Sequence, residues 1–337
     1  MVRLDLAIEL EYQVLQPTDF IFNIHPVNTA RQKVDSEKLS LTPDIPYDIE
    51  LCRTFGNRHL RAHAEPGTFR VNYSATADLC HRFDPVQQIV EMPIPKIPAD
   101  VIVYLYPSRY CPSDRLSNIA MQQFGAMEHT YARVEAISQW VRERTRFQIG
   151  TTNFLTCAYD TFNDRVGVCR DFAHLMISMC RALNIPARFV TGIDYGADPA
   201  LGPTDFHAYV EVYMSGRWYI FDPTGISPTT GLVRIGTGRD ASDVAFATVF
   251  GSVMWTVPRI SITAHEDLDA GIELPHRTTH AVCMADTESV GSLFGPTVPP
   301  DRLMPSPRPP ARLYGGQPVF LPPRASAPGV AASRQPS

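Results

Sequence analysis

A cysteine, Cys169, stands where a thiol could act as a nucleophile. It lies in the stretch NDRVGVCRDFAHLM, after a glycine-containing loop and directly before an apolar helical pattern. The first turn of a helix carries N–H groups without intrahelical partners and the positive end of the macrodipole, and both favour a thiolate. Asp171 in the same turn stabilises the helix, but its charge opposes the thiolate, and the sequence leaves that balance open.

A cysteine at a helix start is usually a packing residue unless a base and an orienting group can reach it. The candidate base is His207 in DFHAYVEVY, and the candidate orienting group is Asp222 in YIFDPT. A carboxylate beside an imidazole fixes the ring and stabilises the imidazolium, which in turn stabilises a thiolate.

The chain between these two residues reads as a β-hairpin with Ser215-Gly216 as its two-residue loop. In that register Asp222 lies opposite Tyr209 and is a diagonal neighbour of His207, at a Cα separation of roughly 7–8 Å. A carboxylate can reach an imidazole nitrogen across that gap. Tyr209 then either shapes the site or is an ordinary aromatic strand residue.

The elements that would position these residues can be read from local patterns. Apolar residues alternate along 4–14 and again along 20–24, and 57–79 reads as a hairpin that turns at Glu65-Pro66-Gly67. Residues 128–147 and 169–183 carry apolar stripes at helical spacing. The fold class expected is α+β, with a small antiparallel β domain, a sandwich by its pattern, before a helix-and-sheet core.

We expect five segments along the chain. A β domain over 1–95 is followed by a linker over 96–119, which begins within the proline-rich MPIPKIPAD. The core spans 120–262, a C-terminal extension spans 263–295, and a proline-rich tail over 296–337 is expected to be disordered.

GVCRDFAHLM, FHAYVEVY and WYIFDPT, in this order and spacing, resemble the core of the transglutaminase-like superfamily, whose fold is papain-like. The resemblance covers roughly residues 120 to 260. The strand-rich first hundred residues and YPSRYCPSDRL (106–116) look like bacterial members that carry their own N-terminal region. The resemblance implies a cysteine-bearing helix packed on an antiparallel sheet that carries the other two residues.

For the site, the resemblance implies that Cys169 is the nucleophile, His207 the general acid/base and Asp222 its partner. Trp140 could add an oxyanion donor as in related enzymes, although its helical setting favours core packing. The implied chemistry is acyl transfer from protein or peptide amides through a thioester, without a metal or a cofactor.

Three hypotheses about the function remain open. Hydrolysis, as in a cysteine protease or amidase, is favoured over transfer to an amine, as in a transglutaminase. The third is a catalytically idle scaffold that uses the fold to bind a partner.

Other features carry less information. His174, on the same helix as Cys169, is expected on its polar face, and Arg239 and Asp240 could border the cleft. Residues 231–251 lack a GxxxxGK[ST] phosphate loop.

Composition and charge restrict the partners and the cellular compartment that we expect for this protein. A formal net charge of −5 gives no reason to expect nucleic-acid or membrane binding, and the charged start MVRLDLAIELEYQ lacks the apolar segment of a signal peptide. Seven cysteines without a CxxC pair argue against a disulfide framework or a structural zinc site. We therefore expect a cytoplasmic protein; its oligomeric state stays open.

Overall fold

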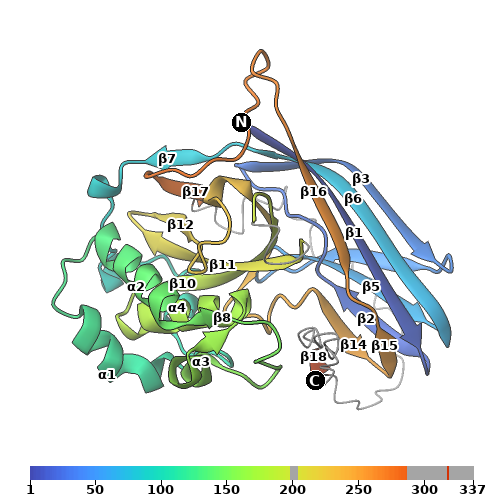
Figure 1. Cartoon of the computed structure of the whole chain (residues 1–337), viewed down its shortest axis with the longest axis horizontal. Helices are drawn as coiled ribbons and strands as arrows, with labels where there is room; N and C mark the ends of the chain where they lie inside the picture. Colours follow the sequence, from blue (N-terminus) through green and yellow to red (C-terminus); the bar gives the residue numbers. More distant parts are fainter. Residues whose placement is uncertain (198–203, 287–316, 319–337) are drawn as a thin grey trace, which may run out of the picture.

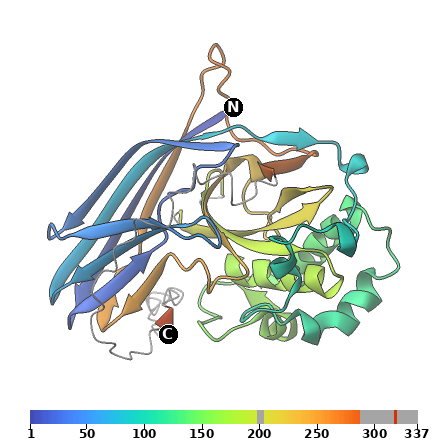
Figure 2. The same ribbon diagram turned by 180° about the vertical axis from the view of Figure 1, so that it is seen from behind.

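The computed structural model describes residues 1–197, 204–286 and 317–318, and shows an α+β protein built mainly from antiparallel sheets (Figure 1). Helices α1–α4 cover one face of a central sheet, and long strands form a β-sandwich on its other side. The view from behind shows the same order of layers (Figure 2). Two apolar cores fill the spaces between the layers.

The first sheet of the sandwich is centred on β1, which pairs with β6 on one side and with β15 and β16 on the other. Every second side chain of β1 is buried, as its alternating sequence predicts. The strands of this sheet are β1 (Val2–Val14), β3 (Gln32–Thr42), β6 (Gly67–Leu79), β15 (Val253–Trp255) and β16 (Arg259–His265).

The second sheet of the sandwich has the order β18-β14-β2-β5-β4. Its strands are β2 (Thr18–Phe22), β4 (Tyr47–Leu51), β5 (Arg58–Ala64), β14 (Ala247–Phe250) and β18 (Gln317–Pro318). Phe20 and Leu60 from this sheet share a core with Phe69 of the first sheet. The predicted sandwich is therefore confirmed.

The predicted hairpin over 57–79 is wrong. The chain does turn between β5 and β6, but β5 pairs with β2 and β4, whereas β6 pairs with β1 and β3. Turn residues predict a change of direction and not a partner. Here the chain crosses between the two sheets, because that places the apolar faces of both strands in the same core.

The central sheet has the strand order β13-β10-β11-β12-β17-β7. These strands are β7 (Arg82–Asp84), β10 (Ala187–Asp194), β11 (Phe206–Met214), β12 (Arg217–Phe221), β13 (Leu232–Gly238) and β17 (Ala281–Asp286). The predicted β11–β12 hairpin is confirmed, since Met214 pairs with Arg217. Ser215 and Gly216 both have positive φ angles, +45° and +79°, as a type I′ turn requires.

Four α-helices pack on the face of this sheet that is turned away from the sandwich (Figure 1). The predicted helices over 128–147 and 169–183 correspond to α2 and α4. The helices are α1 (Ser113–Phe124), α2 (Tyr131–Arg144), α3 (Ala158–Asp164) and α4 (Cys169–Ala182). Helix α4 is central, because it contacts the other three helices as well as β10 and β11.

Short elements complete the described chain. Two-residue strands β8 (Arg146–Phe147) and β9 (Val166–Gly167) pair in parallel, and β9 lies just before α4 in the chain. The 3-10 helices are η1 (Val86–Gln88), η2 (Ile94–Lys96), η3 (Ile102–Leu105) and η5 (Thr229–Gly231). The predicted linker thus contains η3 and the first part of α1.

The sandwich and the central sheet each contain strands from both the early and the late part of the chain. Strand β7 leaves the sandwich and joins the edge of the central sheet, and β14–β16 return to the sandwich after the core. The predicted boundaries near 95 and 262 therefore follow the order of the chain, whereas each folded part takes strands from both sides of a boundary.

The predicted tail, 296–337, lies outside the described residues except for 317–318, which pair with β14. Among the helices of the described part, none has the length and apolarity needed to cross a bilayer.

Candidate active site

Cys169 is the first residue of α4, and its thiol is half-buried and free. The preceding residue, Val168, has an extended backbone with φ −112° and ψ 179°, so the helix begins sharply at the cysteine. Strand β9 leads into this point and is held by β8. The thiol lies 4.0 Å from the carbonyl oxygen of Phe206, at the start of β11. The loop and helix expected for Cys169 are thus present, and they place its sulfur next to the strand that carries His207.

The structure shows how Asp171 acts beside Cys169. Its Oδ2 accepts hydrogen bonds from the N–H of Val168 at 2.9 Å and from the hydroxyl of Thr152 at 2.7 Å. Its Oδ1 accepts one from Arg170 at 3.2 Å. The carboxylate therefore caps the helix start, and its charge is paired rather than left to face the thiol.

Gly167 permits this cap. A Cβ at Gly167 would lie 2.7 Å from the Cβ of Asp171, too close for any side chain. The glycine two residues before the cysteine is thus required by the close approach of Asp171.

His207 lies on β11 and is 6% exposed. Its Nε2 is 3.3 Å from Oδ1 of Asp222, an ion-pair distance at which the N–H is not aligned as a regular hydrogen bond. Because Nε2 faces the carboxylate, Nδ1 is the ring nitrogen left for another partner. The Cys169 thiol is a further group that raises the pKa of the ring. Burial by itself lowers the pKa of His207, but Asp222 and the thiol outweigh it and raise the pKa well above 6.5.

Asp222 directly follows β12 and is 5% exposed. Its Oδ1 accepts hydrogen bonds from the N–H of Thr224 at 2.9 Å and from its hydroxyl at 2.6 Å. Its Oδ2 lies 3.4 Å from the N–H of Ser227. Burial by itself raises the pKa of Asp222, but His207 and Thr224 together lower it to about 2, so the carboxylate is ionised at neutral pH.

The turn that carries Asp222 is fixed by Arg142 of α2. Its guanidinium donates to the backbone carbonyl of Asp222 at 3.0 Å and to that of Pro223 at 3.5 Å. It lies against Gly225, which has a φ of +67°, and a Cβ there would be 2.6 Å from Cζ of Arg142. Helix α2 thereby positions the carboxylate that faces His207.

Other residues singled out in the sequence have different settings. Trp140 stacks on Phe162 and makes an edge contact with Phe124, so it packs in the helical core. Tyr209 is fully buried between the central sheet and the sandwich, as an aromatic strand residue.

His174 is fully buried, so its expected place on a polar face is wrong. Its ring stacks on Tyr110 with centroids 5.1 Å apart, and its Nε2 accepts a hydrogen bond from the N–H of Ala241 at 3.1 Å. The reason is that α4 is surrounded by the other three helices and the sheet. Burial lowers the pKa of His174 and keeps the ring neutral.

Asp240 is also fully buried and does not border an open cleft. It accepts hydrogen bonds from the N–H of Tyr110 and from Ser242. Arg239 pairs with Asp243 at 2.9 Å.

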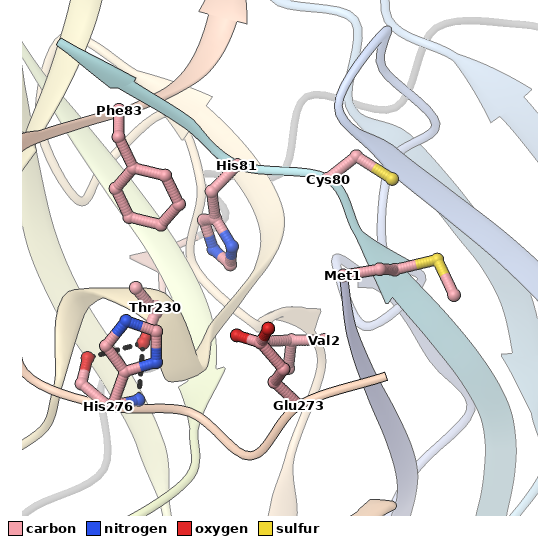
Figure 3. Close-up of a pocket in the computed structure, with 8 residues that line it drawn as sticks. All are labelled: Met1, Val2, Cys80, His81, Phe83, Thr230, Glu273 and His276. Carbon is pink, nitrogen blue, oxygen red and sulfur yellow. Dashed lines mark hydrogen bonds between the residues drawn. The ribbon is translucent and has the colours of Figure 1, made fainter. Parts of the chain in front are cut away.

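A pocket of about 220 Å³ lies elsewhere, where the start of β1 meets the β6–β7 connection and residues 273–276 (Figure 3). Cys80, His81, Glu273 and His276 line it, and it contains none of Cys169, His207 and Asp222. Burial lowers the pKa of His81 to about 4. Within the described ranges, no group of three or more His, Cys, Asp or Glu residues is placed to hold a metal ion.

The fold and these side chains define a papain-like α+β protein with a thiol, an imidazole and a carboxylate in one cluster. Residues 117–223 match the model of the transglutaminase-like superfamily, and residues 2–100 match that of the bacterial transglutaminase N-terminal domain. A crystal structure of a "putative cysteine protease" from Cytophaga hutchinsonii is 38% identical, covers 84% of this chain and 97% of its own, and superposes with a TM-score of 0.78. The chain belongs to the transglutaminase-like superfamily.

Curated relatives are more distant. An uncharacterized protein of Mycobacterium leprae is 30% identical over 146 residues, which cover 42% of this chain and 52% of the relative. An uncharacterized protein of Mycobacterium tuberculosis is 30% identical over 109 residues, which cover 29% of this chain and 35% of the relative. The match thus spans about half of the first relative and about a third of the second. Family and fold together support a cysteine-based enzyme.

The residues that hold Asp222 in place, chiefly Thr224 and Arg142, are not among those predicted from the sequence. A signal for Thr224 was present, because Asp-Pro-Thr-Gly is typical of a turn in which the aspartate accepts a backbone N–H two residues on. No local pattern links Arg142 to a turn eighty residues later.

Proposed function

We propose that this protein is a cysteine-nucleophile acyl-transfer enzyme that acts on protein or peptide amides, with water as the preferred acyl acceptor. The observation that carries the proposal is a helix-start thiol, Cys169, next to the start of the strand that carries His207, whose imidazole is paired to the buried carboxylate of Asp222. The name of the Cytophaga hutchinsonii relative favours hydrolysis.

In the first half of the reaction, the Cys169 thiolate attacks the amide carbonyl carbon. A C–S bond forms and the carbonyl oxygen becomes an oxyanion. The His207 imidazolium then gives its proton to the leaving nitrogen, the C–N bond breaks, and a thioester and a free amine result. Asp222 keeps the ring oriented and stabilises its charged form.

In the second half, neutral His207 takes a proton from water as the oxygen attacks the thioester carbon. A C–O bond forms, the C–S bond breaks, and a carboxylic acid leaves with the thiolate and imidazolium restored. An amine in place of water gives a new amide, which is the transglutaminase alternative.

The start of α4 supplies a donor for the oxyanion. The N–H of Cys169 is one of the first N–H groups of the helix, which lack intrahelical acceptors. A backbone donor at this point is preorganised, because the Asp171 cap fixes the turn.

A single incubation separates the two acceptors. A glutamine-containing peptide and a fluorescent primary amine are mixed with the protein in ¹⁸O water, and products are read by mass spectrometry. Acid products that carry ¹⁸O, and no amine adduct, are expected; accumulation of the amine adduct would instead establish the transglutaminase alternative. Cys169→Ala is the control for both.

The idle-scaffold alternative is tested without a substrate. Iodoacetamide labelling near pH 6 compares Cys169 with Cys80, which is an exposed cysteine in the same molecule. We expect Cys169 to be labelled faster, and the difference to disappear in His207→Ala. Equal rates at the two thiols in the unmodified protein would favour the scaffold.

A further inference from the structure

A second carboxylate, Asp194, is buried close to His207. It is the last residue of β10, the strand beside β11, and it is 6% exposed. Gly192 pairs with His207 across the two strands. Asp194, two residues further on, is therefore a diagonal neighbour of His207, at a Cα separation of about 7–8 Å.

Ser227 joins this carboxylate to Asp222. Its hydroxyl donates a hydrogen bond to Oδ2 of Asp194, and its backbone N–H faces Oδ2 of Asp222 at 3.4 Å. Ser227 is itself 2% exposed. One serine thus contacts the carboxylates on both sides of His207 and ties the Asp222 turn to β10.

The charged groups around His207 come from several elements. Asp222 follows β12, Asp194 ends β10, the Cys169 thiol belongs to α4, and Asp205 directly precedes β11. Asp205 is exposed and accepts a hydrogen bond from the N–H of Phe206.

Three arginines lie nearby, and each has contacts of its own. Arg142 of α2 bonds to the backbone carbonyls of Asp222 and Pro223, and Arg277 bonds to those of Gly225 and Ile226. Arg170 contacts Asp171. These arginines thus contact backbone carbonyls or Asp171, whereas Asp222 and Asp194 act on the ring itself.

We propose that Asp194 is a positioning residue for the acyl-transfer reaction, which holds the Asp222 turn through Ser227 and faces His207 as a second negative charge. The role rests on the proposed function. Burial lowers the pKa of His207, whereas Asp222, the thiol and Asp194 raise it, in that order of size. The imidazolium that must protonate the leaving nitrogen is thus stabilised by two carboxylates, one at the end of β10 and one directly after β12.

The test compares Asp194→Asn, which keeps the shape and removes the charge, with Ser227→Ala, which keeps the charge and removes the bridging hydroxyl. Two readouts are taken against pH: the alkylation rate of Cys169, and the titration of His207 by NMR of ¹³C-labelled imidazoles, assigned by its loss in His207→Ala. Asp240→Asn serves as a matched control, because Asp240 is a buried carboxylate that is hydrogen-bonded elsewhere.

In Asp194→Asn we expect His207 to lose its proton about one pH unit lower, because one nearby negative charge is gone. The alkaline limb of the alkylation profile should move by the same amount. Ser227→Ala should lower the plateau rate several-fold and leave the position of the limb nearly unchanged. Asp194→Glu, which retains the charge, should restore the limb at least in part.

If Asp194 has only a structural role, Asp194→Asn lowers the melting temperature, as Asp240→Asn is expected to do. His207 then loses its proton at the same pH as in the unmodified protein. That result would overturn the proposal. Failure of the proposed function looks different, because the protein would then turn over no amide or label Cys169 no faster than Cys80. In that case the NMR titration alone still decides whether Asp194 sets the charge of His207.

Discussion

Nε2 of His207 lies 3.3 Å from Oδ1 of Asp222, and both side chains are almost completely buried. A buried ion pair is stable only when each charge has further partners, because desolvation penalises both ions. Here Asp222 has the donors of Thr224 and Ser227, and His207 has the thiol of Cys169. The pair therefore links the helix that carries the sulfur to the turn after β12.

This pair makes stability depend on pH in a defined direction. The folded-state pKa of Asp222 is lowered to about 2, below its unfolded value of about 3.9. Its contribution is thus fully present above about pH 4 and is lost as the pH falls toward 2. The folded-state pKa of His207 is raised, so its contribution is complete below about pH 6.5 and is lost as the pH rises through the raised value.

We predict that Asp222→Asn lowers the denaturation midpoint most between pH 4 and 6, where both partners are charged. The difference from the unmodified protein should shrink toward pH 2, where Asp222 takes up a proton. Urea midpoints measured across this range check the prediction. A difference that is constant with pH would show that the ion pair does not contribute to stability through its charges.

Thr224→Val removes the hydroxyl that donates to Oδ1 of Asp222 at 2.6 Å and leaves the backbone N–H donor in place. The carboxylate then holds the His207 imidazolium less well. We expect kcat/KM to fall about tenfold, which corresponds to about 1.4 kcal/mol for a hydrogen bond to a charged group. The alkylation rate of Cys169 should fall in parallel.

The matched control is Thr76→Val on the sandwich, which removes a hydroxyl that donates to Asp5 at 2.7 Å. It should leave both rates unchanged. Equal effects of the two substitutions would show that Thr224 acts through general stability and not through Asp222.

The sequence predicts the parts of the site that depend on local patterns. Two glycine-compatible turn residues fix the β11–β12 register, and that register alone makes Asp222 a diagonal neighbour of His207. The start of α4 at Cys169 follows from the apolar spacing and from the acid at Asp171.

The parts that the sequence does not predict depend on contacts between distant segments. The pairing of β16 with β1 joins residues more than 240 positions apart, and no local period encodes it. The crossing between β5 and β6 has the same turn chemistry as a hairpin. His174 is buried because three other helices surround α4. Asp194 lies near His207 because β10 pairs with β11, and no local pattern specifies that pairing.

Gly225→Ala tests whether the Asp222 turn must be held against α2. Alanine at this position is strained by the φ of +67°, and its Cβ would lie within 3 Å of the Arg142 guanidinium. We expect the free energy of unfolding to fall by more than about 1 kcal/mol, which is the loss that a positive φ alone causes. Activity per folded molecule should also fall, because the displaced turn carries Asp222.

Gly271→Ala separates the two causes. Gly271 has a φ of +70° but nothing within 4 Å of an added Cβ. Its alanine variant should show the backbone effect alone, with full activity per folded molecule. If both variants lose the same stability and keep the same activity, the contact with Arg142 has no role in the site.

His174 gives the molecule a sensitivity to acid that is separate from the site chemistry. Its pKa is lowered in the folded state because the ring is fully buried. As the pH falls below about 6.5, the unfolded chain binds a proton there that the folded chain does not, so stability decreases by up to about 1.4 kcal/mol per pH unit.

Glutamine does not titrate, and its carbonyl can still accept the hydrogen bond from Ala241. We therefore predict that His174→Gln is less stable at pH 7, because the stacking on Tyr110 is lost, but loses less stability than the unmodified protein between pH 6 and 4. Urea midpoints at four or five pH values measure the two slopes. His280→Gln, at an exposed position, should leave the slope unchanged, and parallel curves for His174→Gln and the unmodified protein would mean that the buried ring is protonated in the folded state.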